Sequence, residues 1–372
     1  MNMDVRIVEG DFAAFFAAPF VVYGRDAYLA SPLESDLRAA FAPERNPLLK
    51  QGRARLTWFT AHRGDRVVGR ITAHIHDVSN RLHGLRRSYF GMLDCVDDRD
   101  VAAALLDACG DWGRSRGCNE LIGNFNLTIT QMIGTLSGGH EHRPYTYQDW
   151  SPPYLPGLLE ACGFERTYPM RTFEIDTDTV DEEVLLGPRQ RMLLADPDWS
   201  FRPIPKRGLE ASLRAACGVL NDGFADNPMF VPLSEEEFIF PSKGLGLVMD
   251  ERLSCMARHH GEPVGAVLCI PDLNPLLHAM HYRLGWSAPW HYLRHRRPRR
   301  AALLFYAVRR SHHNLGVNGV MLQRVLTAMC DGGYERLGIS WVSDDNLASL
   351  RQMEKLDARP LHRLHLFRKA LI

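Results

Sequence analysis

The feature that most constrains the fold is a pattern that occurs twice, about half a chain apart. Residues 61–70 read Ala-His-Arg-Gly-Asp-Arg-Val-Val-Gly-Arg, and residues 257–266 read Ala-Arg-His-His-Gly-Glu-Pro-Val-Gly-Ala. Each segment joins two apolar runs through a polar turn that contains glycine, which is typical of a β-hairpin. Such hairpins are common, but a repeat at this distance predicts one architecture that is built twice.

Length and composition agree with two soluble domains. A chain of 372 residues exceeds the size at which one hydrophobic core usually stops growing. The 44 basic residues balance 44 acidic ones, so no overall charge favours nucleic acid or an anionic membrane. No apolar run approaches the ~20 residues that span a bilayer, and Asp4, Glu9 and Asp11 interrupt any signal-peptide pattern. We therefore expect a cytoplasmic protein.

The eight cysteines form no CxxC pair and no cluster with histidine at zinc-ligand spacing. Most of them lie inside apolar runs, which favours buried, reduced thiols. We therefore expect no bound metal.

Hydrophobic periodicity predicts a similar order of elements in both halves. In the first half we expect strands at 55–62, 66–76, 88–96 and 120–126, with helices from the acidic turn 97–100 to about 116 and at 155–162. In the second half we expect helices at 209–224, 319–330 and 346–356, a hairpin at 253–270, and strands at 301–308, 336–342 and 364–369. Residues 188–205 are rich in Pro, Arg and Asp and poor in periodicity, so we place a linker there between domains 1–187 and 206–372.

This order of strands and helices resembles that of GNAT acyltransferases, so the chain resembles an α/β (α+β mixed-sheet) protein with two GNAT-like domains in tandem. In that superfamily the turn after the central strand has the form Gln/Arg-x-x-Gly-x-Gly/Ala and holds the coenzyme A pyrophosphate at a helix N-terminus. Ser311, Asn314 and Gly316 stand at these three positions. Two of them depart from the pattern, although asparagine tolerates positive φ. The resemblance implies an acyl-CoA site at Val308, Arg310, Asn314, Gly316, Val317, Gly319 and Asn346.

The first half lacks this turn. Asp97, Asp98 and Asp100 stand where the phosphates would lie, and their charges would repel a pyrophosphate. We therefore expect the first domain to serve as a substrate or scaffold domain and the second to hold the acyl-CoA.

Four segments, 90–98, 123–126, 271–274 and 340–346, are similar to a group of bacterial tandem GNAT proteins that includes ceramide synthases. This resemblance implies N-acyl transfer from a thioester, either acyl-CoA or acyl carrier protein, to a small-molecule or lipid-like primary amine by direct attack. The resemblance is also consistent with transfer of a long-chain acyl group. Two alternatives stay open: an aminoacyl-tRNA-dependent amide-forming transferase, and a non-catalytic GNAT-like binding protein whose cofactor turn has decayed.

Amide formation needs a base for the amine and an acid for the departing thiolate. A polar, glycine-rich run at 130–141 follows a predicted strand end, where ligands commonly bind in α/β folds; the alternative is a surface loop. The candidate bases are His140, Glu141 and Asp149. The candidate acid is Tyr282, which lies in a strand-like stretch and for which a structural role is the alternative. The candidate substrate-binding residues are Asn124, Asn126, Thr130, Gln131 and Tyr147.

Two further clusters have alternative interpretations. Tyr145, Tyr147, Trp150 and Tyr154 either line an acyl channel or form a packed aromatic contact between domains. Trp286 and Trp290 precede a basic run of Arg294, His295, Arg296, Arg297, Arg299 and Arg300. This run is a site for the coenzyme A 3′-phosphate, for acyl carrier protein or for the inner membrane surface, or it is a solvated loop. We expect no nucleic-acid partner, because the basic patch is single and lacks a binding motif.

Overall fold

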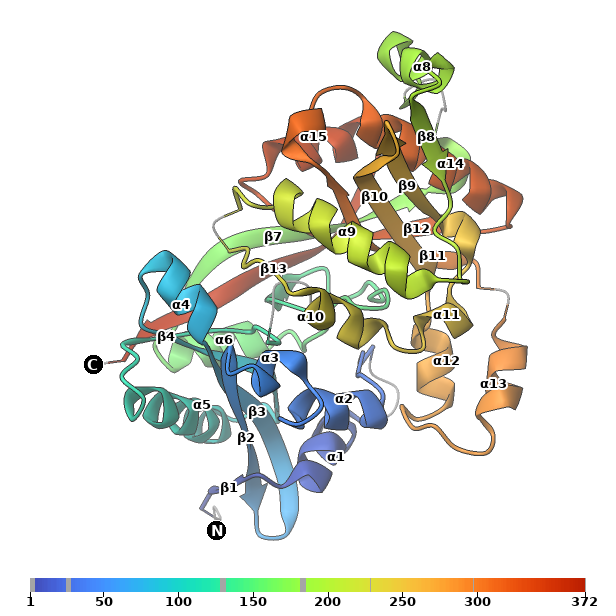
Figure 1. Ribbon diagram of the computed structural model, residues 1–372. Coiled ribbons are helices and arrows are strands. Elements are labelled where there is room, and N and C mark those ends of the chain that lie inside the picture. Colours follow the sequence, from blue (N-terminus) through green and yellow to red (C-terminus); the bar gives the residue numbers. More distant parts are fainter. Residues whose placement is uncertain are drawn as a thin grey trace. The chain divides into compact units, whose positions relative to one another are not determined.

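The computed structural model describes residues 4–24, 28–127, 132–180, 185–227, 229–296 and 298–371. The chain divides into two compact units (Figure 1). Unit 1 comprises Met1–Arg171, Tyr282–Leu284 and His362–Ile372, and unit 2 comprises Thr172–His281 and Gly285–Leu361.

The sheet of unit 1 has the strand order β1-β2-β3-β4-β5-β13, and β6 pairs with β13. Strands β4 and β5 are parallel, and the other pairs are antiparallel. The strands are β1 (Arg6–Glu9), β2 (Ala54–Arg63), β3 (Arg66–His76), β4 (Arg87–Cys95), β5 (Glu120–Gly123), β6 (Thr135–Gly138) and β13 (Arg359–Ala370). The helices are α1 (Phe12–Tyr23), α2 (Glu34–Phe41), α3 (Pro47–Lys50), α4 (Asp77–His83), α5 (Arg99–Arg114) and α6 (Leu155–Ala161).

The sheet of unit 2 has the strand order β7-β12-β11-β10-β9-β8. Strands β11 and β12 are parallel, whereas β8, β9, β10 and β11 pair antiparallel. The strands are β7 (Glu165–Asp176), β8 (Trp199–Arg202), β9 (Ser254–His259), β10 (Glu262–Pro271), β11 (Arg300–Val308) and β12 (Arg336–Ser343). The helices are α8 (Pro188–Ala195), α9 (Leu209–Gly223), α10 (Glu235–Ile239), α11 (Leu245–Val248), α12 (Asn274–Ala279), α13 (Ala288–Arg294), α14 (Val317–Asp331) and α15 (Leu347–Lys355). Four 3-10 turns are η1 (Thr177–Thr179), η2 (Phe240–Ser242), η3 (Glu251–Leu253) and η4 (Arg310–His312).

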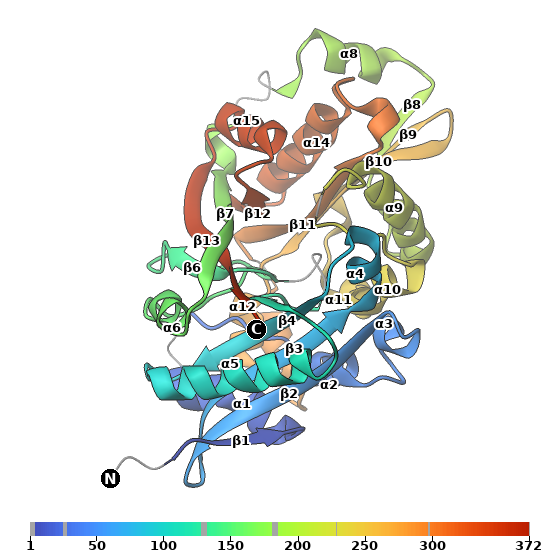
Figure 2. The same ribbon diagram turned by 90° about the vertical axis from the view of Figure 1, so that its left-hand side faces the viewer.

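The two hairpins predicted from the repeated pattern are β2–β3 and β9–β10. In each, the repeated Val-Gly places a glycine under the main helix of its unit. A Cβ atom on Gly69 would lie 2.8 Å from Leu105 Cδ1 of α5, and one on Gly265 would lie 3.0 Å from Met321 of α14. Figure 2 shows α5 lying across β3 and β4. The repeat therefore marks the same helix-on-sheet contact in both units, and the predicted mixed α/β architecture of two similar units is confirmed.

The main helices bury the faces that the sequence predicts. In α5, Val101, Leu105, Cys109 and Trp112 are buried, and these residues recur at the spacing of one helical face. The Asp98 carboxylate caps the start of α5, and Gly117, with φ of 80°, follows its end. Both ends therefore follow from local chemistry.

Three local expectations were wrong. The stretch 188–205, which we expected to be a linker, contains helix α8 and strand β8, and β8 pairs with β9. The strand expected at 120–126 ends at Gly123. The segment before Tyr282, which a strand-like pattern suggested, forms α12 and a turn. The division of the chain also falls inside β7 and β13, because each of these strands has residues in both units.

Candidate active site

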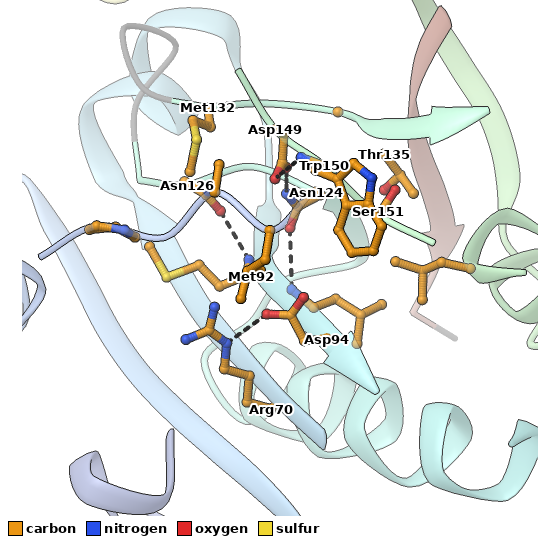
Figure 3. Close-up of a pocket in the computed structure, with 16 residues that line it drawn as sticks. Arg70, Met92, Asp94, Asn124, Asn126, Met132, Thr135, Asp149, Trp150 and Ser151 are labelled. Carbon is orange, nitrogen blue, oxygen red and sulfur yellow. Dashed lines mark hydrogen bonds and ion pairs between the residues drawn. The ribbon is translucent and has the colours of Figure 1, made fainter. Parts of the chain in front are cut away.

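The central strands of unit 1 diverge where the candidate site lies. Strand β4 pairs with β5 only from Arg87 to Tyr89, and β5 ends at Gly123 while β4 continues to Cys95. The register between β3 and β4 also shifts near Arg70, and Met92 on β4 has φ of 47°. A small pocket lies beside this part of β4 (Figure 3).

Two asparagine side chains take the place of strand pairing along β4. The Asn126 Oδ1 atom accepts a hydrogen bond from the Met92 backbone N–H at 2.9 Å, and Asn124 Oδ1 accepts one from Leu93 at 3.4 Å. Both side chains line the pocket. Both amide oxygens are therefore satisfied by the backbone, and the Asn124 amide nitrogen is directed to a carboxylate.

That carboxylate belongs to Asp149. Its Oδ2 atom accepts a hydrogen bond from Asn124 Nδ2 at 2.5 Å, and its Oδ1 atom accepts one from the Trp150 backbone N–H at 3.0 Å. Burial, followed by the nearby charge of Asp94, raises the pKa of Asp149 to about 7. A carboxyl group with a pKa near neutrality exchanges protons readily at cellular pH, which suits a general base.

Asp94 forms a buried ion pair with Arg70 at the same pocket. The Arg70 Nε–Asp94 Oδ2 distance is 2.7 Å, and both side chains are almost fully buried. Arg70 also donates to the Phe15 carbonyl at 3.2 Å, and its guanidinium lies over the Phe15 ring. This pair was not predicted from the sequence. Its signal is that each residue is a single charge inside an apolar strand, where charges are rarely buried without a partner.

Two polar groups at the pocket have no hydrogen-bond partner in the described part of the chain. They are Trp150 Nε1 and Thr135 Oγ1, both buried, and both residues line the pocket (Figure 3). The Trp150 ring meets Tyr23 edge to face, with centroids 5.4 Å apart. Because unpaired buried polar groups are costly, these two are available to an oxygen atom of a ligand.

The structure separates the three candidate bases. Asp149 lines the pocket, whereas His140 and Glu141 do not. The His140 Nδ1 atom lies 3.1 Å from the Ser151 carbonyl. The Glu141 side chain is 73% exposed and lies 3.4 Å from His142. Asp149 is therefore the candidate base that the pocket geometry favours.

The other first-half candidates lie in different surroundings. Tyr147 is 47% exposed and does not line the pocket. Tyr145 is fully buried, and the Tyr154 hydroxyl donates to the Cys95 carbonyl at 2.7 Å. Of the four aromatic residues considered for an acyl channel, Trp150 alone is among the described pocket residues. Thr130 and Gln131 lie outside the described residues.

Tyr282, the candidate acid, is an anchor within unit 1. It follows α12 with φ of 56°, and its hydroxyl donates to the Leu29 carbonyl at 2.5 Å. Burial raises the pKa of Tyr282 to about 12, and its ring lies 5.5 Å from that of Phe20. These contacts agree with the structural alternative, because the hydroxyl already has a backbone acceptor.

Unit 2 repeats the divergence of central strands at its predicted cofactor turn. Strand β11 pairs with β12 from Arg300 to Leu303, and the following residues 303–306 of this central strand are only partly buried. The turn then contains two left-handed residues, Asn314 with φ of 63° and Gly316 with φ of 97°, and asparagine was noted from the sequence as a residue that tolerates positive φ. No side chain from the described part of the chain caps the start of α14 at Gly316. The backbone of this turn thus leads into an uncapped helix N-terminus.

The other candidate cofactor residues have mixed surroundings. Val308 and Val317 belong to the buried core of unit 2, so only their backbones can meet a ligand. Arg310 lies 3.7 Å from Asp222 and 3.3 Å from Asp226. Asn346 caps α15 by accepting from the Ser349 N–H at 3.1 Å.

Helix α8 covers this turn. A Cβ atom on Gly316 would lie 2.8 Å from Gln190 Nε2, and one on Gly319 would lie 2.8 Å from the Leu185 carbonyl. Arg189 also donates to the Asn314 carbonyl at 3.4 Å. This helix over the turn was not predicted, because we expected residues 188–205 to form a linker.

The start of α5, the equivalent position in unit 1, is occupied by a protein carboxylate. Asp98 Oδ1 accepts from the backbone N–H groups of Asp100 and Val101 at 2.9 and 3.3 Å, and Asp98 also pairs with Arg63 at 2.8 Å. A phosphate would have to displace this carboxylate.

Among the described residues no group of His, Cys, Asp and Glu side chains has the geometry to hold a metal ion. Nor does any described helix have the length and apolar character needed to cross a membrane.

Comparison with known proteins agrees with this arrangement. A model of the acetyltransferase (GNAT) family matches residues 225–357, which include the β11–α14 turn. The tandem GNAT protein from the clavulanic acid biosynthesis pathway superposes with a TM-score of 0.57 at 14% identity, and the match covers 99% of each chain. Residues 225–357 therefore match the acetyltransferase (GNAT) family, and the whole chain has the fold of a tandem GNAT protein.

The chain is also similar over its whole length to two bacterial proteins. The bacterial ceramide synthase of Caulobacter vibrioides (strain NA1000 / CB15N) is 26% identical over 382 residues, which is 100% of this chain and 98% of that protein. Protein YghO of Escherichia coli (strain K12) is 24% identical over 373 residues, which is 98% of this chain and 94% of that protein. The likeness therefore extends beyond the segment that the family model matches.

Proposed function

We propose that this enzyme transfers an acyl group from an acyl thioester to a primary amine of a long-chain, lipid-like acceptor. The observation that carries the proposal is Asp149, a carboxyl group with a pKa of about 7 at a pocket between diverging central strands of a GNAT fold. The similarity to a protein named ceramide synthase supports the acceptor class. Coenzyme A is the usual acyl carrier in the GNAT family, and acyl carrier protein is the other donor.

In the proposed reaction, Asp149 removes a proton from the ammonium form of the acceptor. The neutral nitrogen then attacks the thioester carbonyl, so that a C–N bond forms, the C–S bond breaks and the thiolate leaves to take up a proton. Burial is the main cause of the raised pKa of Asp149, and the nearby carboxylate of Asp94 adds to it, whereas Arg70, the ion-pair partner of Asp94, lowers this pKa. The acid that protonates the thiolate stays a prediction, because the Tyr282 hydroxyl already donates to Leu29.

The proposed donor site is the turn before α14. Its support is the pair of left-handed residues Asn314 and Gly316 and the uncapped start of α14, where backbone N–H groups favour phosphate. Gln190 of α8 borders both Gly316 and Gly319. We therefore infer that this side chain shifts, or donates to a phosphate oxygen, when coenzyme A binds.

The pocket also indicates what the acceptor carries beside its amine. The Trp150 Nε1–H group is a donor only, and the Thr135 hydroxyl both donates and accepts. Both lie at the pocket with Asp149 and have no partner in the described part of the chain. An amine with a neighbouring hydroxyl or carbonyl oxygen would satisfy them, as a long-chain amino alcohol would.

A donor and acceptor panel tests the function. Purified enzyme is given palmitoyl-coenzyme A or palmitoyl-acyl carrier protein, together with a long-chain amino alcohol, a simple alkylamine or no amine, and thiol release is followed. We expect amine-dependent release, fastest with the amino alcohol. Thiol release only when aminoacyl-tRNA is added would show that the enzyme is the RNA-dependent transferase instead. No thiol release with any pair of donor and amine would contradict the proposal.

A further inference from the structure

Exposed apolar side chains gather on two short helices of unit 2 that lie next to each other. Trp286 is 97% exposed, Leu247 78% and Trp290 61%, and Tyr292 and Leu293 are also exposed. The Tyr292 hydroxyl on α13 donates to the Leu247 carbonyl on α11 at 3.3 Å, and Figure 1 shows the two helices as neighbours. We call Leu247, Trp286, Trp290, Tyr292, Leu293, Arg294 and Arg296 the α11–α13 patch.

These side chains have no role in the core. Helix α13 contributes no buried residue, although five of its seven positions, and Trp286 before it, carry apolar or aromatic side chains. Single exposed apolar residues are common on soluble proteins, but a group of this size normally marks an interaction site.

The patch also carries positive charge that the protein does not neutralise. Arg294 and Arg296 are exposed, and no ion pair of either is found within the described ranges. By contrast, Arg299 pairs with Glu335, and Arg300 lies 3.4 Å from Asp272. The segment 283–300 contains no acidic residue, although the chain as a whole has no net charge. The positive charge is therefore local to this segment; Arg297, which belongs to the same basic run, lies outside the described residues.

We propose that the α11–α13 patch docks on the surface of an anionic phospholipid bilayer. Tryptophan and tyrosine side chains favour the membrane–water interface, leucine side chains enter the acyl boundary, and arginine binds phosphate headgroups. An acidic carrier protein would need the arginine charges, but it would not account for two tryptophans and two leucines exposed beside them. The combination of apolar and cationic groups on one patch favours lipid. This inference is independent of the proposed acyl transfer.

Vesicle co-sedimentation tests the inference with the full chain. Vesicles of phosphatidylcholine mixed with phosphatidylglycerol are compared with vesicles of phosphatidylcholine alone, at low and at high salt. We expect binding to the anionic vesicles that weakens as salt rises, because counterions screen the arginine charges. Absence of binding to anionic vesicles at low salt would overturn the proposal.

Two double variants separate the contributions of the patch. Trp286→Ser with Trp290→Ser, and Arg294→Gln with Arg296→Gln, should each lower the partition onto anionic vesicles about tenfold or more, and the arginine variant should also lose its salt dependence. The matched control is Met192→Ser on α8, an equally exposed apolar residue of the same unit, which should bind as the wild type does.

Thiol release with short, water-soluble substrates should be unchanged in the tryptophan variant, which shows that the fold is intact. Wild-type binding by the tryptophan variant, or capture of acidic acyl carrier protein with equal affinity by wild type and tryptophan variant, would contradict a lipid site.

Discussion

Asp149 is the residue on which the proposed chemistry depends. Replacing it with asparagine keeps the size of the side chain and removes the base, so we expect kcat to fall by about 10²–10⁴. The wild-type rate should rise with pH through about 7, where Asp149 ionises, and this step should be absent from the residual activity of Asp149→Asn. A larger loss of rate in Glu141→Gln than in Asp149→Asn would assign the base to the exposed loop instead.

The same carboxyl group gives a stability prediction. Burial raises its pKa from 3.8 to about 7 in the folded protein, so the native state binds more protons than the unfolded state between these values. The free energy of unfolding should therefore fall as pH rises through this window, by about 1–3 kcal/mol from this group. Urea unfolding of wild type and Asp149→Asn at about pH 5 and about pH 8 measures this contribution. Equal pH dependence in the two proteins would show that Asp149 is not perturbed.

Trp150 tests the acceptor class. Trp150→Phe removes the unpartnered Nε1–H and keeps an aromatic ring against Tyr23. We expect KM for a long-chain amino alcohol to rise about tenfold, the cost of one buried hydrogen bond, while KM for an alkylamine without oxygen stays the same. Trp58→Phe is the matched control, because Trp58 Nε1 also has no partner in the described structure but lies outside the pocket. A similar rise for both amines would indicate a packing effect.

At the scale of elements, the β11–α14 turn carries the prediction for the donor. Gly316 and Gly208 both precede a helix of unit 2 in the left-handed region, with φ of 97° and 76°. Gly316→Ala and Gly208→Ala should each cost about 1 kcal/mol through backbone strain. Gly316→Ala alone should weaken coenzyme A binding about tenfold or more, because only its turn lies at the proposed phosphate site. Equal affinity of the two variants for coenzyme A, measured by calorimetry, would show that coenzyme A does not bind at this turn.

Elements with a clear hydrophobic period could be predicted from the sequence, and others could not. The face of α5 with Val101 and Leu105 and the two hairpins follow from local patterns. Helix α1 is apolar nearly all round and contains Pro19, so it shows no helical face. Helix α8 buries no side chain, and its stretch therefore resembles a linker. Helices α1 and α8 therefore depend on contacts with distant parts of the chain, which a local sequence pattern does not reveal.

At the scale of the whole molecule, the repeat predicted two similar units, but the division between them depends on long-range pairing. The last strand, β13, pairs with β5 of unit 1 from Phe367 to Ala370, a contact between residues more than two hundred positions apart. The Arg70–Asp94 pair was missed for the same reason, because it depends on the register of β3 against β4. Asp149 could be named from the sequence, whereas its proximity to Asn124 and Asp94 required the fold.

Ligand binding should stabilise the molecule as a whole. Palmitoyl-coenzyme A at a hundredfold excess over its Kd should raise the free energy of unfolding by about 2.7 kcal/mol, and coenzyme A without the acyl chain should have a smaller effect at the same concentration. Thermal unfolding with increasing ligand measures this effect. An equal effect of the two ligands would show that the acyl chain makes no contact of its own.

The most direct test of the central claim is mass spectrometry of the product formed from palmitoyl-coenzyme A and a long-chain amino alcohol. The account predicts an N-palmitoyl amide, formed in equal amount to the free coenzyme A thiol and almost absent with Asp149→Asn. An ester on the hydroxyl oxygen, or no acylated product although the thioester binds, would contradict N-acyl transfer.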